Sequence, residues 1–295
     1  MLRWIIACLV LCGFVHPATA RQPQFRGGAV AADHVLASKA GVAILARGGN
    51  AVDAAVATSF ALSVTRPFSC GLGGGGFMVI WDPHRGAFAL NYREVAPQSA
   101  DPAMYAAADK NSPPPSRYGE AAIAVPGTVA GLLTAHERFG RLSRQEVLAP
   151  AIDLAVRGFV PDKAYRAAID GVRKRREQVP GIENYADEVL GTFDQHDRIR
   201  LPGQAVVLRR IAQEGREGFY GGDVALAIIE STRGRLTMRD LTEYMPRWEE
   251  PLVADIGDEL MLIGMPPPST GGVAVGQLLG MLHRLGAAKM DRDNP

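Results

Sequence analysis

Apolar residues in the first hundred positions of the chain follow helical spacing in two neighbouring segments. The spacing predicts a helix over residues 29–47, capped by Asp33 and ended by Gly48-Gly49-Asn50. A second helix is predicted from Ala51 to Val64. Because this segment is apolar on all sides, we expect it to be buried, and its many alanines indicate close approach to a neighbouring layer.

Strand-like runs separated by turn residues predict antiparallel hairpins. Two hairpins are expected on this basis, one from Phe77–Trp81 and Ala87–Tyr92 and one from Leu252–Ile256 and Glu259–Ile263. The run Ala121–Val125 is predicted as a further strand. No alternating strand–helix–strand pattern is visible, so the order of elements argues for an α+β fold with antiparallel sheet.

The remainder of the chain is predicted to be mostly helical. A capping box formed by Ser143 and Glu146 introduces a helix that runs to about Val156. Residues 162–235 are expected to be mostly helical and more charged. A last apolar helix is expected over residues 273–285. We find neither an internal repeat nor a flexible linker, so one large domain is expected after the leader.

The N-terminus has the pattern of a cleaved export signal. Arg3 precedes the apolar stretch Trp4–Val15, and Ala18-Thr19-Ala20 supplies the small residues that signal peptidase recognises. The apolar core is shorter than the roughly 20 residues that a membrane span needs. We therefore expect residues 1–20 to be a signal peptide, Arg21 to be the mature N-terminus, and the protein to be periplasmic or secreted without a membrane anchor after cleavage.

Composition excludes several classes of partner and cofactor. The net charge of +1 and the 47% hydrophobic content are those of an ordinary globular protein, so neither nucleic acid nor a membrane surface is expected as a partner. Histidines beyond the signal peptide do not occur at metal-ligand spacing, so we expect no metal and no other cofactor. Cys70 is the cysteine that processing leaves, and it is predicted to be a buried structural thiol rather than a nucleophile.

Four short segments carry candidate chemistry, each with a purely structural alternative. The glycine run Gly73–Gly76 lacks the lysine and the following helix of a nucleotide-binding loop, and it indicates either a tight backbone crossing or a wall of a ligand site. The pair Arg93-Glu94 at a strand end could bind a carboxylate or form an internal ion pair. Ser269 and Thr270 follow three prolines, and Ser269 could present a hydroxyl or cap a helix. Asp53 is expected to cap backbone N–H groups.

Taken together, these segments resemble the gamma-glutamyltransferase family. The matching motifs occur in the family's order: Gly48–Ala57, Gly71–Met78, Tyr92–Pro97, Val125–Gly131, Asp240-Leu241 with Tyr244, and Pro266–Gly272. The resemblance implies an N-terminal-nucleophile hydrolase with an αββα sandwich. Its members are exported precursors that cut themselves into a large and a small subunit. A threonine at the start of the small subunit then attacks a γ-glutamyl amide, typically that of glutathione.

The resemblance assigns roles to residues of this chain. Arg93 matches the arginine that binds the α-carboxylate of the γ-glutamyl group, and Glu94 looks like a support for site geometry. The residues Gly73, Gly74, Ser269 and Thr270 look like structural parts around the site. Transfer of the γ-glutamyl group to water is hydrolysis, and its transfer to an amino acid or peptide is transpeptidation.

Residues 21–295 depart from the family in one respect. They contain no threonine in the family's self-cleavage context, so we expect no catalytic residue in this chain. We expect a truncated large-subunit region, an incomplete sandwich, and a separate small-subunit chain that supplies the nucleophile. Two alternatives stay open: a non-catalytic remnant that binds γ-glutamyl compounds, and an amidase with substrates like those of cephalosporin acylases.

Overall fold

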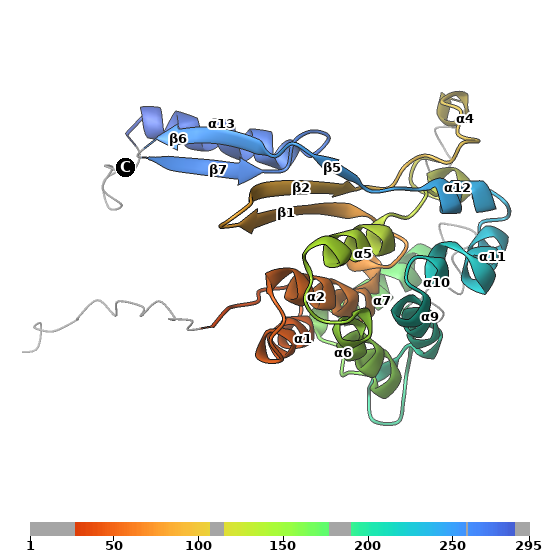
Figure 1. The fold of residues 1–295 in the computed structure, drawn as a ribbon. Coiled ribbons are helices and arrows are strands. Elements are labelled where there is room, and N and C mark those ends of the chain that lie inside the picture. The colour runs from red at the N-terminus through yellow and green to blue at the C-terminus, as the bar shows by residue number, and fades with distance from the viewer. Residues whose placement is uncertain (1–26, 107–114, 177–189, 258, 287–295) are drawn as a thin grey trace, which may run out of the picture.

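The computed structural model describes residues 27–106, 115–176, 190–257 and 259–286. The predicted signal peptide lies outside these ranges. Figure 1 shows most of the helices gathered on one side of a small antiparallel sheet, with a second hairpin and a long helix on the other side. The mixture of helices and antiparallel strands confirms the predicted α+β class.

The first two helices form a packed pair. Helix α1 spans Val35–Ala46 and α2 spans Ala51–Thr65. Helix α1 begins later than predicted, and its N-cap is His34 rather than Asp33, because His34 Nδ1 accepts the Leu36 N–H at 3.1 Å. Asp33 instead binds the buried guanidinium of Arg66. Most of α2 is buried, as its continuous apolar sequence predicted.

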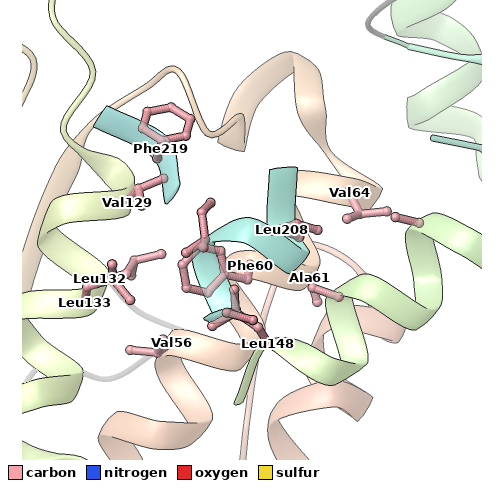
Figure 2. Packing of buried hydrophobic residues seen from close by; sticks show 14 of the residues in the cluster. Val56, Phe60, Ala61, Val64, Val129, Leu132, Leu133, Leu148, Leu208 and Phe219 are labelled. Atoms are coloured by element: carbon pink, nitrogen blue, oxygen red, sulfur yellow. The ribbon is translucent and has the colours of Figure 1, made fainter. Parts of the chain in front are cut away.

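Helices from the middle of the chain follow α2, and several of them complete the core around it. They are α3 (Pro67–Cys70), α4 (Ala103–Ala106), α5 (Thr128–Phe139), α6 (Arg144–Arg157), α7 (Lys163–Arg176), α9 (Pro202–Glu214), α10 (Glu217–Tyr220), α11 (Gly222–Ser231) and α12 (Met238–Glu243). Figure 2 shows Phe60 of α2 among Leu132 of α5, Leu148 of α6 and Leu208 of α9. All four side chains are almost entirely removed from solvent, so the hydrophobic effect joins these helices into one core.

A three-stranded sheet lies against this core. Strands β1 (Gly76–Asp82) and β2 (Gly86–Tyr92) form the first predicted hairpin, and β5 (Arg247–Glu249) pairs with β2 on its other side. The register sets Gly76 opposite Tyr92, so the start of β1 lies beside the end of β2. Residues Arg93 and Glu94 therefore leave the sheet next to the glycine run.

The second predicted hairpin is also present. Strands β6 (Leu252–Gly257) and β7 (Leu260–Gly264) pair antiparallel, and α13 (Thr270–Arg284) packs against them (Figure 1). Apolar side chains on this unit, including Met261 and Leu278, are more than half exposed.

One local prediction was wrong, and one region that is mostly helical, as predicted, also contains a short hairpin that was not expected. The expected strand Ala121–Val125 is a 3₁₀ turn at Glu120–Ala122 followed by a single bridge between Val125 and Val95. The region predicted to be mostly helical contains a small hairpin, β3 (Thr192–Phe193) and β4 (Ile199–Arg200). In both places the elements are too short for a periodic pattern to develop.

Candidate functional site

Arg93 is the first residue after β2, and both of its backbone polar groups are held. Its N–H donates to Asn91 Oδ1 at 3.0 Å, and Asn91 in turn donates to Glu249 of β5 at 2.7 Å. Its carbonyl oxygen accepts the Tyr244 hydroxyl at 2.9 Å. The sheet and a distant tyrosine thus fix the point from which the Arg93 side chain starts.

The guanidinium of Arg93 is accessible. Its side chain is 55% exposed, and Nη1 lies 3.3 Å from Glu94 Oε2. Its Cζ atom lies 5.9 Å from the centre of the Phe77 ring. The internal ion pair considered for Arg93 and Glu94 is therefore present, but such a half-exposed pair is weak and leaves other N–H groups free for an anion.

Glu94 points one carboxylate oxygen into the protein. Oε2 is buried, and at its 3.3 Å separation from Arg93 it is ion-paired without a well-aligned hydrogen bond among the described residues. A buried acceptor without a hydrogen bond costs about 1–3 kcal/mol. Such an oxygen is typical of a site whose remaining partner comes from a ligand or another chain segment.

The glycine run makes a close backbone crossing at two positions. The Gly74 carbonyl accepts the N–H groups of Gly127 and Thr128 at 2.8 and 2.9 Å, so it closes the N-terminus of α5. A Cβ atom at Gly75 would lie 2.6 Å from the Tyr92 carbonyl oxygen and 2.8 Å from Glu94 Oε2. Gly73 is different, because a Cβ atom there would meet no atom of the described residues within 4 Å.

Two cavities border Arg93. One of about 300 Å³ is lined by Cys70, Gly74, Arg93, Glu94 and Thr128, among others. Another of about 600 Å³ is lined by Gly73, Arg93, Glu94 and residues 121–124, among others. Volumes of this size suit small molecules. Arg93 and Glu94 border both, so these two residues and the glycine run form one site.

Cys70 does not have the predicted environment. It was expected to be a buried thiol, but its side chain is partly exposed and borders the smaller cavity. Its Sγ lies 3.6 Å from the Ser69 hydroxyl oxygen. The glycines that follow leave the end of α3 open to the cavity, which sequence periodicity could not indicate.

Ser269 and Thr270 lie at the start of α13. Ser269 occupies the N-cap position, but its side chain makes no capping hydrogen bond, so the predicted capping contact is absent. Neither residue borders the two cavities at Arg93. The structure therefore brings Arg93, Glu94, Gly73 and Gly74 together and places the two hydroxyl residues on the β6–β7 unit.

A group of tyrosines behind Arg93 was not assigned a role from sequence. The Tyr220 hydroxyl donates to the Pro126 carbonyl at 2.8 Å, and the Tyr220 and Tyr244 rings stack with centres 6.1 Å apart. Burial, followed by the nearby charge of Glu94, raises the pKa of Tyr244 to about 12. Its hydroxyl therefore stays protonated and able to donate throughout the neutral range. The Asp240–Tyr244 motif was the available signal for this group.

Neither a helix that could span a membrane nor a metal-ligating cluster occurs in the described ranges. Across those residues, none of the helices has the length and apolarity needed to cross a bilayer. The same part of the chain contains no group of three or more His, Cys, Asp or Glu side chains placed to share a metal ion.

Comparison with known proteins identifies relatives along most of the chain. The glutathione hydrolase proenzyme of Pseudomonas aeruginosa is 42% identical over 261 residues, which are 86% of this chain and 45% of that protein. The proenzyme of Escherichia coli strain K12 is 34% identical and matches 93% of this chain and 47% of its own length. The chain thus spans about half the length of these curated relatives.

Solved structures agree with the sequence relatives. The gamma-glutamyltranspeptidase of Pseudomonas nitroreducens superposes with a TM-score of 0.79 at 37% identity, covering 90% of this chain and 78% of that one. The Helicobacter pylori enzyme gives a TM-score of 0.78 at 32% identity, covering 89% and 76%. These neighbours have the N-terminal-nucleophile hydrolase fold. The family model for gamma-glutamyltranspeptidase matches residues 37–295, and the chain therefore belongs to the gamma-glutamyltranspeptidase family.

Proposed function

We propose that this chain is the large-subunit region of an enzyme that hydrolyses or transfers γ-glutamyl groups, with glutathione as a typical donor. The observation that carries the proposal is Arg93, whose backbone is fixed and whose guanidinium is 55% exposed at two cavities. A guanidinium can bind a carboxylate through two parallel hydrogen bonds. In the proposed complex it binds the α-carboxylate of the γ-glutamyl donor.

The remaining site residues support this contact in the proposal. Glu94 holds the Arg93 guanidinium on one side, while Gly74 ties the site to the N-terminus of α5. Gly73 forms an open part of the cavity wall. Ser269 at the N-cap and Thr270 in the first turn of α13 line neither cavity at Arg93, so their support of the site is proposed to be indirect, through the placement of α13.

The attacking group is proposed to come from a separate small-subunit chain or segment with an N-terminal threonine. Its hydroxyl attacks the γ-carbonyl carbon, its amine takes the proton, and the leaving amine is expelled with a proton. Water or an acceptor amine then attacks the ester between the glutamyl group and the threonine, which releases glutamate or the γ-glutamyl amide and regenerates the threonine hydroxyl. The chain covers 45% of the Pseudomonas aeruginosa proenzyme but 78% of the solved Pseudomonas nitroreducens chain, which supports a division into two chains.

Export is proposed from the N-terminal pattern alone. Cleavage after Ala20 would release a large-subunit region that begins at Arg21 into the periplasm or outside the cell. Mass determination of the exported product tests this step. A mature protein that begins at Arg21 supports it, and a product that retains Met1 in the cytoplasm contradicts it.

The test of the activity is reconstitution. The chain is co-expressed with each reading frame adjacent to its gene, and release of the chromophore from a γ-glutamyl anilide is measured. Activity that appears only with a partner beginning in threonine supports the proposal. Absence of product with every adjacent frame contradicts the enzymatic role.

Experiments can distinguish the proposed γ-glutamyl activity from two alternatives, an acylase activity and a non-catalytic binding function. Cephalosporin acylase from Bacillus halodurans superposes with a TM-score of 0.69 at 31% identity, which keeps an acylase substrate as a second candidate. Comparing the release rates of γ-glutamyl and cephalosporin side chains decides between them.

The other alternative is a non-catalytic binder. It predicts heat on titration with glutathione, lost in Arg93→Ala, without turnover in any reconstituted mixture.

A further inference from the structure

Tyr244 reaches Arg93 from the far end of the chain. It lies 151 residues later and directly follows α12. The approach requires a glycine at position 127, where a Cβ atom would lie 2.3 Å from the Tyr244 hydroxyl oxygen. Because Asn91 holds the Arg93 N–H and Tyr244 holds its carbonyl, the peptide groups on both sides of the Arg93 Cα are fixed.

Tyr244 is itself held from behind by Arg216. The Arg216 guanidinium donates to the carbonyl oxygens of Tyr244 and Thr242, the latter at 3.2 Å. Its Cζ atom lies 4.5 Å from the centre of the Tyr220 ring, and that ring stacks on Tyr244. Tyr244 is 5% exposed, so the ring has little freedom to leave this position.

Helix α12 also holds the other end of the segment that begins with Arg93. Asp240 Oδ1 accepts the Gln98 N–H at 2.8 Å, and the Gln98 side chain donates to Glu243 at 2.9 Å. Residues 93–98 are therefore bound to α12 and Tyr244 at both ends. The other oxygen of Asp240 accepts the Thr237 N–H in the capping box of α12, so this buried carboxylate serves both contacts.

We propose that Tyr244 is a positioning residue for the γ-glutamyl donor, which acts by fixing the Arg93 backbone so that the guanidinium meets the donor α-carboxylate. The proposal rests on the proposed function of Arg93. A preorganised side chain loses less conformational entropy when its ligand binds. Because this contact is equally present in the bound donor and in the transition state, losing it raises KM and leaves kcat unchanged.

The test is Tyr244→Phe in the reconstituted enzyme, assayed with a γ-glutamyl anilide. We expect KM to rise roughly three- to tenfold, the effect of one net hydrogen bond, with kcat within about twofold of the parent value. Tyr165→Phe in α7 is the matched control, since it also removes a buried hydroxyl. That hydroxyl donates to the Leu190 carbonyl at 2.7 Å. That control should lose thermal stability and keep its KM.

A second variant, Arg216→Gln, carries the test if Tyr244→Phe does not fold. It should raise KM in the same direction, and an unchanged KM in the folded Arg216→Gln enzyme contradicts the positioning role. Where Tyr244→Phe does fold, the double variant should show no further rise, because both changes act through one contact. An unchanged KM in the folded Tyr244→Phe enzyme overturns the positioning role and leaves the proposed function standing. A reconstituted parent enzyme that neither binds glutathione nor turns over the anilide overturns both.

Discussion

At the scale of single residues, Asp53 shows how a fully buried carboxylate is accommodated. Its Oδ2 accepts the Asn50 N–H at 2.8 Å, which is the capping contact predicted from sequence. Both oxygens also accept the Arg141 N–H at 3.0 Å, from a turn 88 residues later. The same side chain therefore caps α2 and ties it to the turn between α5 and α6, and only the first of these contacts has a local signal.

Replacing Asp53 by Asn should destabilise the protein by about 2–4 kcal/mol, because an amide NH₂ would face backbone N–H donors in a buried place. Ser143→Ala is the control. It removes a capping side chain at an exposed helix start and should cost about 1 kcal/mol. Urea unfolding measures both changes. Equal losses for the two variants would contradict the role given to Asp53.

His34, at the start of α1, makes the stability of the protein depend on pH. Burial, followed by the charge of Arg66, lowers the pKa of His34 below its usual value of about 6.5. Asp162 and Asp33 act in the opposite direction through their negative charges. The folded state thus binds fewer protons at this residue than the unfolded state, so its contribution to stability is full above about pH 6.5 and is lost as the pH falls below it.

The variant His34→Asn isolates this effect, because asparagine keeps a side-chain acceptor for the Leu36 N–H and does not titrate. Between about pH 6.5 and pH 5, the unfolding free energy of the parent should fall more steeply than that of the variant. The measurement is denaturant unfolding across that range. Parallel curves for the two proteins would show that His34 is not buried in its neutral form.

At the scale of elements, the close packing of α1 and α2 depends on small residues. A Cβ atom at Gly41 of α1 would lie 2.3 Å from Thr58 Oγ1 and 3.1 Å from the Ala54 carbonyl oxygen on α2. The alanine-rich sequence of α2 predicted such an approach. No sequence pattern indicated that Gly41 would be the contact point, since a glycine within a helix is expected only to lower the stability of that helix.

Gly41→Ala should therefore destabilise the protein by about 1–3 kcal/mol through overpacking. Gly171→Ala in α7 is the matched control. Among the described residues, its Cβ atom would meet only the flexible Arg175 side chain, at 3.6 Å, so the better helix propensity of alanine should stabilise the protein by up to about 1 kcal/mol. Thermal unfolding distinguishes the two. A shift in the same direction for both variants would contradict the packing argument.

Long periodic elements were predicted well, and short ones were not. The pattern located α2, α6, α13 and both hairpins because their apolar spacing and flanking turn residues are local properties. It missed β3 and β4, which contain two residues each and are defined by pairing across a turn. It misplaced the segment around Ile123, whose apolar residues face the core without forming a ladder.

At the scale of the whole molecule, the candidate site is assembled from distant parts of the chain. Arg93 and Glu94 come from the end of β2, Gly74 from the loop before β1, and Tyr244 from the end of α12. Local sequence predicted Arg93 at a strand end, and the family resemblance supplied its role. The contact between Arg93 and Tyr244 could not be predicted, because it depends on how the tertiary structure brings α12 to the sheet.

The central claim is that Arg93 binds the α-carboxylate of a γ-glutamyl donor. The most direct measurement compares, by calorimetry on the reconstituted enzyme, the affinities of glutathione and of its analogue without the α-carboxylate. The parent should prefer glutathione by roughly ten- to a hundredfold, the range expected for a charge-assisted contact. In Arg93→Ala this preference should disappear. An Arg93→Ala enzyme that retains the full preference would contradict the account.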